Sequence, residues 1–176
     1  MKELKEILFG VNIDSVYGDT NLSVSGISFD SRQIKQNNIF IAIKGYDLDG
    51  HNYIDQSINN GAKVVVCEKL PKKINKYEIV FIEVKCSKTA LYIISSNFYG
   101  NPSSKIDLIG VTGTNGKTTI TSLLYKLFNN QGIKSGLIST INIEYEEFTE
   151  NSKNTTPDPI LLNHHLNEMV KRNIKV

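Results

Sequence analysis

The sequence lacks any long hydrophobic run, and no stretch approaches the roughly 18 consecutive apolar residues that a membrane-spanning helix needs. Its first ten residues, MKELKEILFG, are amphipathic, so neither a signal peptide nor a membrane span is indicated. An excess of either charge is also lacking. The 20 basic and 18 acidic residues leave a net charge of +2, which indicates neither a nucleic-acid nor a membrane partner.

Cysteine is scarce, and histidine offers no metal site. Cys67 and Cys86 form no C-x-x-C pair and lie in or beside expected strands, which favours reduced thiols in a cytoplasmic protein over a disulfide between them. The disulfide stays open as the alternative. His164 and His165 are adjacent on an expected helix and point about 100° apart, so they cannot share a metal ion, and His51 has no partner nearby in sequence.

The first hundred residues alternate between strand and helix patterns. The composition, 40% hydrophobic and 22% charged over 176 residues, suits one globular domain or two small ones. Strands are expected at residues 24–29, 39–43, 63–67 and 79–84, and helices near residues 4–11, 54–60 and 88–98. This alternation predicts an α/β domain. The sequence GNPSS at residues 100–104 breaks the last helix and is expected to mark the domain boundary, at residue 101.

Residues 106–131 are the stretch on which the functional interpretation depends. The short apolar run IDLIGV is typical of a buried parallel strand. The loop TGTNGK follows, and apolar residues then recur at helical spacing. They predict a helix with one core-facing stripe, formed by Ile120, Leu123, Leu124, Leu127 and Phe128.

The loop between this strand and helix has the features of a phosphate-binding loop. Gly113 and Gly116 allow the backbone to turn its N–H groups toward an anion at the helix N-terminus. Lys117 would reach the terminal phosphates, and the hydroxyl of Thr118 would join a magnesium shell. The general pattern G-x-x-x-x-G-K-[ST] is not met, because Val111 stands where its first glycine belongs. The order of strand, loop and helix is what favours nucleotide binding over an ordinary turn.

The remaining residues predict more of the same α/β arrangement. GLIST at residues 136–140 indicates the next strand of a parallel sheet, and the acidic residues 143–150 indicate a solvent-facing hairpin or loop. RNIKV at residues 172–176 is typical of the end of a helix followed by the start of a strand. With about two strands and two helices, this second domain is expected to be incomplete.

Two polar motifs have simple local interpretations. Asp30-Ser31-Arg32 is most simply a turn between two strands. NTTPDP at residues 154–159 precedes a helical pattern, and Thr156 or Asp158 can cap that helix, with a proline in its first turn. The apolar face of the helix carries Leu162, Leu166, Met169 and Val170.

Taken together in chain order, three motifs resemble the ATP-dependent Mur ligases of peptidoglycan synthesis. They are FDSR at residues 29–32, GVTGTNGKTT at 110–119 and NTTPDP at 154–159. The family's loop has the form T-G-T-N-G-K-[ST], which accounts for the missing glycine. The resemblance implies a small N-terminal α/β domain, residues 1–101, that binds a UDP-MurNAc-peptide. Residues 102–176 would be the first part of a parallel-sheet P-loop ATPase domain.

Within the family, the D-S-R segment resembles the ligases that add the third peptide residue and those that add the terminal dipeptide, and the other two motifs favour the former. The implied reaction uses ATP and Mg²⁺ to phosphorylate the D-glutamyl carboxylate of UDP-MurNAc-L-Ala-D-Glu. The amine of lysine or meso-diaminopimelate then attacks the acyl phosphate. The expected enzyme is a cytoplasmic monomer whose partners are these small molecules, with no nucleic acid and no membrane.

The resemblance also assigns site residues. ATP is expected to bind Thr114, Asn115, Gly116, Lys117, Thr118 and Thr119. Of these, Lys117 would stabilise the phosphoryl group in transfer and Thr118 would bind the metal. The UDP-sugar peptide is expected to contact Ser31, Asn154, Thr155 and Thr156. The family's magnesium-binding glutamate, carbamylated lysine and C-terminal amino-acid-binding domain would lie beyond Val176, so the chain is expected to be an inactive fragment.

Two interpretations from other classes stay open. The chain could be a module that binds a UDP-sugar peptide or a nucleotide without turnover. It could also be a generic phosphate-loop ATPase, in which case the two other motifs would be coincidences.

Overall fold

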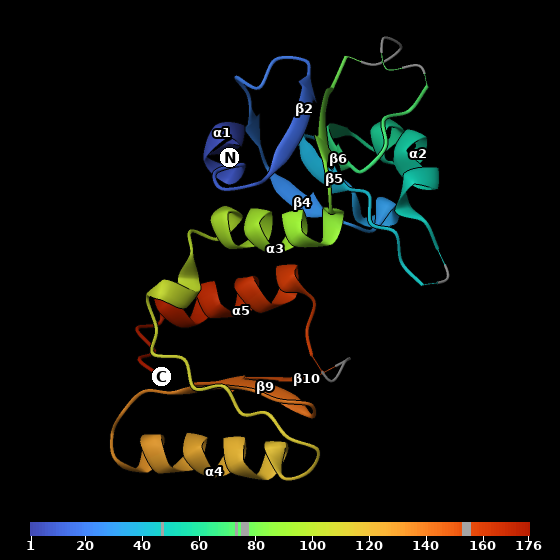
Figure 1. Cartoon of the computed structure of the whole chain (residues 1–176). Helices are drawn as coiled ribbons and strands as arrows, with labels where there is room; N and C mark the ends of the chain where they lie inside the picture. Colours follow the sequence, from blue (N-terminus) through green and yellow to red (C-terminus); the bar gives the residue numbers. More distant parts are fainter. Residues whose placement is uncertain (47, 73, 75–77, 153–155) are drawn as a thin grey trace. The chain divides into compact units, whose positions relative to one another are not determined.

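The computed structural model describes residues 1–46, 48–72, 74, 78–152 and 156–176. Within these residues the chain forms two compact units, Met1–Phe98 and Tyr99–Val176. Each unit combines helices with strands (Figure 1), so the predicted α/β class is confirmed. No helix in the described part of the chain is both long enough and apolar enough to cross a membrane.

A five-stranded sheet forms the centre of the first unit, in the order β2-β7-β6-β5-β4. Its strands are β2 (Ile13–Tyr17), β4 (Gly26–Ser28), β5 (Asn38–Ile41), β6 (Ala62–Cys67) and β7 (Val80–Val84). The last four run parallel, and β2 joins β7 antiparallel at the edge. The expected strand at residues 24–29 is divided, because β3 (Ser23–Val24) pairs with β1 (Lys2–Glu3) in a separate small sheet. The sequence pattern did not predict β2.

The central strands are buried on both faces, as parallel strands covered by helices are. Alternate residues of β5, β6 and β7 join a core cluster with Ile54 at the start of α2, namely Phe40, Val65 and Phe81. Their neighbours in sequence point to the opposite face. These neighbours, Ile39, Val64 and Ile82, are also fully buried. Both sheet faces therefore contribute to the core.

Three α-helices in the described part of the first unit accompany this sheet. They are α1 (Leu4–Ile7), α2 (Ile54–Asn59) and α3 (Ser87–Phe98). All three were predicted, although α1 is a single turn. Cys67 and Cys86 are free thiols, the first buried and the second exposed, so the alternative of a disulfide is not realised.

The second unit places a small antiparallel sheet between two helices (Figure 1). Its elements are the 3-10 turn η4 (Pro102–Ser104), α4 (Lys117–Asn130), β8 (Gly136–Ile138), β9 (Asn142–Tyr145), β10 (Phe148–Asn151) and α5 (Pro159–Lys171). The predicted hairpin is confirmed as β9–β10, but one of its faces is buried. Ile143 and Tyr145 are each 2% exposed and pack with Leu166 and Met169 of α5.

The strand expected at residues 106–111 does not form, and this prediction is wrong. Leu108 and Ile109 are 56% and 52% exposed. A strand needs a continuous hydrogen-bonded ladder, whereas among the described residues the backbone bond found here is the one from the Asp107 N–H to the Lys175 carbonyl, 2.9 Å. The Gly136 N–H in turn donates to the Val176 carbonyl, 2.8 Å. Residues 174–176 thus bond to both neighbouring segments without forming a strand. The expectation that residues 136–140 add a strand to a parallel sheet is wrong, because β8 pairs antiparallel with β9.

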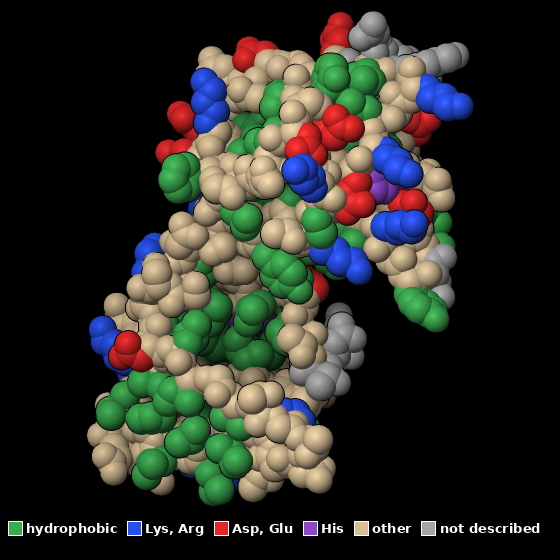
Figure 2. Space-filling model, in the orientation of Figure 1, with side chains coloured by type: hydrophobic (Ala, Val, Ile, Leu, Met, Phe, Trp, Pro, Cys, Tyr) green, Lys and Arg blue, Asp and Glu red, His purple; other side chains and the backbone are tan. Residues whose placement is uncertain are grey.

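Helix α4 forms as predicted, but the expected burial of its apolar stripe is wrong. Ile120, Leu123 and Leu127 are 46%, 62% and 52% exposed, and Figure 2 shows apolar side chains on the surface of this unit. The reason is geometric: α4 has 14 residues and packs mainly on β8, a strand of three. A helix about 21 Å long cannot be covered by a strand of about 10 Å.

One glycine controls how α2 leads into β6. Gly61 has a φ of +109°, and its carbonyl accepts a hydrogen bond from the Asn37 N–H, 2.9 Å, at the start of β5. A Cβ atom at Gly61 would lie 2.9 Å from the Cα of Gln36, which is a backbone atom that cannot easily move. Glycine is therefore required at this position both for its conformation and for the available space.

We expect Gly61→Ala to destabilise the first unit by about 2–4 kcal/mol, combining the strain of a positive φ with overpacking. Gly10→Ala is the matched control, because Gly10 has a φ of +77° with nothing within 4 Å of a built Cβ. It should cost only about 1–2 kcal/mol. Urea denaturation followed by circular dichroism measures both. Equal losses for the two variants would contradict the close contact with Gln36.

A second prediction concerns His165, which is buried in α5 at 2% exposure. Burial and the neighbouring His164 lower the pKa of its imidazole, while Glu150 and Glu168 act in the opposite direction. In the unfolded chain the His165 imidazole takes up a proton near pH 6.5, whereas in the folded protein it is still neutral at that pH. The contribution of His165 to the free energy of unfolding should therefore be fully present above that pH and should be lost as the pH drops below it.

Urea midpoints measured between pH 7.5 and pH 5.5 test this dependence, since carboxylates titrate mainly below about pH 5. As the pH falls, the urea midpoint should decrease less steeply in His165→Gln than in the unsubstituted protein. His164→Gln should retain most of the decrease seen in the unsubstituted protein. Identical slopes for the unsubstituted protein and His165→Gln would contradict the prediction.

Candidate functional site

The start of helix α4 is set by two glycines in the loop before it. Gly116 is the N-cap residue, with a φ of +81°, and its carbonyl accepts the first helical hydrogen bond from the Ile120 N–H, 2.9 Å. Gly113 has a φ of +152°. Side chains rarely adopt these backbone conformations, so both positions require glycine. The loop that the sequence predicted as phosphate-binding therefore has the backbone that such a loop needs.

The predicted ATP-binding residues lie together at this helix N-terminus. Thr114, Asn115 and Gly116 form an exposed loop, and Lys117, Thr118 and Thr119 form the first turn of α4. The first-turn N–H groups have no acceptor within the helix, and no side chain caps them. Free N–H groups and the positive end of the helix dipole together attract an anion such as phosphate.

The two side chains of the first turn with predicted roles, those of Lys117 and Thr118, already have partners. The Lys117 ammonium donates to the carbonyl of Gly113 and, at 3.3 Å, to that of Thr114. It thus lies over the loop, where it would face a bound phosphate. The Thr118 hydroxyl is 2.8 Å from the hydroxyl of Thr140, the second residue after β8. Both groups are positioned on the loop side of α4.

A magnesium ion would find few protein ligands here. Among the residues that the structure describes, no group of three or more His, Cys, Asp or Glu side chains could hold a metal. Mg²⁺ bound with a nucleotide usually takes most of its ligands from phosphate oxygens and water, with one or two from the protein. A single hydroxyl at the first turn of the helix, that of Thr118, fits this requirement.

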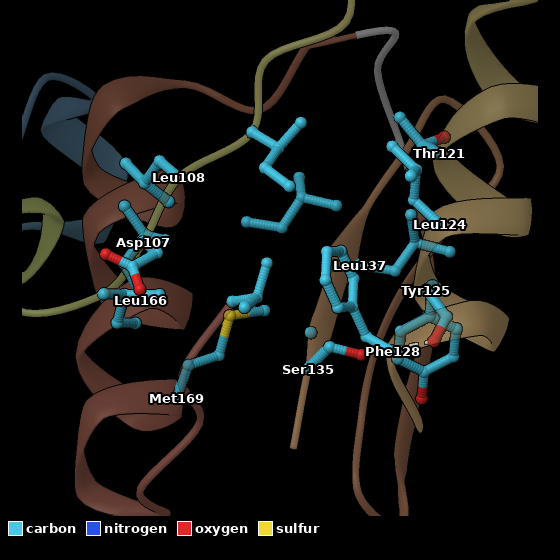
Figure 3. Close-up of a pocket in the computed structure, with 15 residues that line it drawn as sticks. Asp107, Leu108, Thr121, Leu124, Tyr125, Phe128, Ser135, Leu137, Leu166 and Met169 are labelled. Carbon is cyan, nitrogen blue, oxygen red and sulfur yellow. Dashed lines mark hydrogen bonds between the residues drawn. The ribbon is translucent and has the colours of Figure 1, made fainter. Parts of the chain in front are cut away.

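A separate apolar pocket of about 130 Å³ lies between α4 and α5. Figure 3 shows Leu124, Tyr125 and Phe128 of α4 on one side and Leu166 and Met169 of α5 on the other, with strand residues between them. None of the residues expected to bind ATP lines it. This pocket lies beside residues 106–109, which form no strand. Few of the groups that line it are polar and could bind a nucleotide.

In the first unit, Ser31 lines a larger pocket of about 540 Å³. Its hydroxyl donates to the Oε1 atom of Gln56 in α2, 2.9 Å, and its carbonyl accepts from the Nδ2 atom of Asn60, 2.8 Å. Three aromatic residues also line it, namely Phe29, Phe40 and Tyr53, together with the aliphatic residues Ile43 and Leu48. Aromatic walls with a few fixed polar groups are typical of sites for small planar ligands.

The neighbours of Ser31 stabilise the turn that presents it. The Asp30 carboxylate accepts from the backbone N–H of Arg32, 3.0 Å, and from its guanidinium through two bonds of 2.9 and 2.8 Å. Hydrogen bonding from the Arg32 side chain is the main reason that the pKa of Asp30 is lowered. The D-S-R segment thus turns the chain, as its local interpretation suggested, with Asp30 capping the single-turn 3-10 helix η1 (Ser31–Gln33). It also lies at the pocket.

The third motif is only partly described. Asn154 and Thr155 lie outside the described residues, and Thr156 is exposed just before α5. Asp158 caps the helix, because its carboxylate accepts from the N–H groups of Ile160 and Leu161 at 2.9 and 3.0 Å. The capping prediction is therefore confirmed for Asp158.

Three residues at these sites escaped the sequence interpretation. Gln56 and Tyr53 line the pocket with Ser31, and Thr140 contacts Thr118. Ser31 and these two pocket residues, like Thr118 and Thr140, are at least 22 positions apart in the sequence. Residue spacing therefore could not predict these contacts.

Family models match both units of this α/β chain. Residues 23–99 match the model described as "Mur ligase family, catalytic domain", and residues 111–176 match "Mur ligase middle domain". The chain belongs to the Mur ligase family.

Two curated relatives carry the name UDP-N-acetylmuramoyl-L-alanyl-D-glutamate--2,6-diaminopimelate ligase. The protein of Cytophaga hutchinsonii is 46% identical over 169 residues, and that of Phocaeicola vulgatus is 43% identical over 173. These alignments cover 96% and 98% of this chain but 35% and 36% of the relatives. The chain thus spans about a third of the length of these relatives.

Solved structures of MurF have a similar fold. One from Acinetobacter baumannii is 19% identical with a TM-score of 0.61, covering 95% of this chain and 33% of that one. MurF ligase from Thermotoga maritima in complex with ADP is 26% identical with a TM-score of 0.56, covering 82% of this chain and 29% of that one.

We expect Lys117→Ala to weaken Mg-ATP binding by ten- to a hundredfold, since a charged hydrogen bond contributes about 1.5–3 kcal/mol. The melting temperature without ligand should hardly change, because the bonds that the ammonium makes to the Gly113 and Thr114 carbonyls are exposed to solvent. Lys126→Ala, in the same helix, is the control and should bind as the unsubstituted chain does. Calorimetry and thermal melting measure the two properties. A large drop in melting temperature without ligand would count against the assignment.

Proposed function

We propose that this chain is the N-terminal part of an ATP-dependent ligase that adds 2,6-diaminopimelate to UDP-MurNAc-L-Ala-D-Glu in the cytoplasm. The observation that carries the proposal is the 41–46% identity to curated relatives of that name across nearly the whole chain. These names favour diaminopimelate over lysine as the added residue. They also favour the third-residue ligase over the terminal-dipeptide ligase, whose solved structures are 19–26% identical.

In this proposal the two units have different tasks. The first unit, with the pocket at Ser31, would bind the UDP end of the substrate. Its aromatic walls suit a planar base, and the Ser31 and Gln56 side chains supply donors and acceptors at fixed positions. The second unit would hold ATP at the N-terminus of α4. Thr156, with Asn154 and Thr155, is proposed to contact the muramoyl dipeptide.

The proposed chemistry is phosphoryl transfer followed by amide formation. The D-glutamyl carboxylate attacks the γ-phosphorus of ATP, which releases ADP and leaves an acyl phosphate. The amine of the diamino acid then attacks the acyl carbon, inorganic phosphate leaves, and the amine loses a proton. Phosphoryl transfer demands mainly positioning and charge stabilisation.

The residues of the loop can supply both. The N–H groups of the first turn of α4 orient the phosphates, and the Lys117 ammonium neutralises negative charge on the transferred group. Magnesium, held at Thr118, would supply further charge neutralisation between the phosphates. Because the chain spans about a third of its relatives, we propose that these 176 residues bind substrates without completing the ligation.

Calorimetric titration of the chain with UDP-MurNAc-L-Ala-D-Glu and, separately, with Mg-ATP tests the proposal. Ser31→Ala should weaken binding of the UDP-sugar peptide about tenfold, the loss of one well-placed hydrogen bond, and leave Mg-ATP binding unchanged. Ser15→Ala is the matched control, because the Ser15 hydroxyl also bonds a side chain, Glu83 Oε2 at 2.6 Å, but on the β2 edge.

The outcomes separate the interpretations. Binding of Mg-ATP without any binding of the UDP-sugar peptide would favour a generic ATPase. Binding of both ligands, together with diaminopimelate-dependent product formation by the purified chain, would contradict the proposal that it does not complete the ligation.

A further inference from the structure

Thr140 is a second hydroxyl at the nucleotide loop, and none of the three motifs contains it. It lies in the turn between β8 and β9, beyond the carboxyl end of β8. The contact between the Thr140 hydroxyl and the hydroxyl of Thr118, in the first turn of α4, places Thr140 beside the start of that helix.

The turn that carries Thr140 is tightly hydrogen-bonded. Ser139 is 8% exposed, and its Oγ atom lies 2.9 Å from the Asn142 carbonyl oxygen, to which it can donate. The Ser139 Oγ atom also accepts from the backbone N–H groups of Ile141 and Asn142, at 3.3 and 3.1 Å. The Ser139 N–H also donates to the Asn142 carbonyl, 2.9 Å. These bonds enclose Thr140, so its backbone position is fixed by its neighbours.

The hydroxyls of Thr118 and Thr140 are 2.8 Å apart, and either oxygen can be the donor. A hydroxyl has one proton and two lone pairs. If the Thr118 oxygen gives a lone pair to a cation, its proton must point away from the cation toward an acceptor. Thr140 provides that acceptor at hydrogen-bonding distance. The contact thereby selects the rotamer and the proton direction that a metal-binding Thr118 needs.

We propose that Thr140 is a positioning residue for the metal at this site: it accepts the Thr118 proton and turns a lone pair of the Thr118 oxygen toward a divalent cation bound with the nucleotide. This inference rests on the proposed function, because it assumes that the loop binds a magnesium nucleotide. Partners that orient a metal ligand typically contribute ten- to a hundredfold to metal affinity. Thr140 should therefore act on the magnesium-dependent part of nucleotide binding and not on the loop itself.

The test compares ATP affinity in MgCl₂ with ATP affinity in EDTA, by calorimetry on the 176-residue chain. Thr140→Val keeps the shape of the side chain and removes the acceptor. We expect it to lower the gain in affinity from magnesium about tenfold, with binding in EDTA changed less than twofold. Thr140→Ser should restore the gain. Thr121→Val is the control, because the Thr121 hydroxyl bonds the Lys117 and Thr118 carbonyls and not the Thr118 hydroxyl.

Each result decides the matter. An unchanged magnesium gain in Thr140→Val overturns the inference, and so does an equal loss in MgCl₂ and EDTA, which would mean an effect on loop shape. If the unsubstituted chain binds ATP without any magnesium gain, the inference fails while nucleotide binding stands. If it binds no ATP under either condition, the proposed nucleotide site fails and the inference with it. Should Thr140→Val melt early, Thr140→Ala supplies the same comparison.

Discussion

The positive φ angle at Gly116 is the constraint on which the candidate nucleotide site depends. It ends the loop and begins α4 without a side chain at the N-cap, so no side chain caps the first-turn N–H groups. Because the helix starts at Lys117, the ammonium of that residue returns over the loop and the Thr118 hydroxyl meets Thr140. A side chain at position 116 would strain the turn and shift all three groups.

The two units divide the proposed chemistry between them. The first combines a mainly parallel sheet, whose central strands are buried on both faces, with a pocket whose polar groups come from the D-S-R turn and α2. Such a scaffold suits recognition of a large, partly planar substrate. The second presents backbone N–H groups, one ammonium and two hydroxyls at a helix end, which suits phosphates. Neither arrangement alone specifies a ligase, and the proposed ligase activity depends on the similarity to relatives of that name.

Short-range patterns in the sequence predicted the elements well, because they depend on residues close in the chain. The spacing of apolar residues predicted α4 and α5, continuous apolar runs predicted β6 and β7, and Asp158 before Pro159 predicted the cap. Features that depend on distant partners were missed. The stripe of α4 is exposed because only a three-residue strand lies under it, and residues 106–111 form no strand because one hydrogen bond anchors them. Likewise, the Gln56 contact to Ser31 and the Thr140 contact to Thr118 span 25 and 22 residues.

The central claim is that one chain holds a phosphate site at the start of α4 and a UDP-sugar site at Ser31. Amide chemical-shift mapping of the ¹⁵N-labelled protein tests it most directly. Mg-ATP should shift the amides of residues 113–119, and UDP-MurNAc-L-Ala-D-Glu should shift those of residues 30–32 and 53–56, each ligand leaving the other set largely unmoved. Saturating Mg-ATP with no change at residues 113–119, or the UDP-sugar peptide with no change near Ser31, would contradict the account.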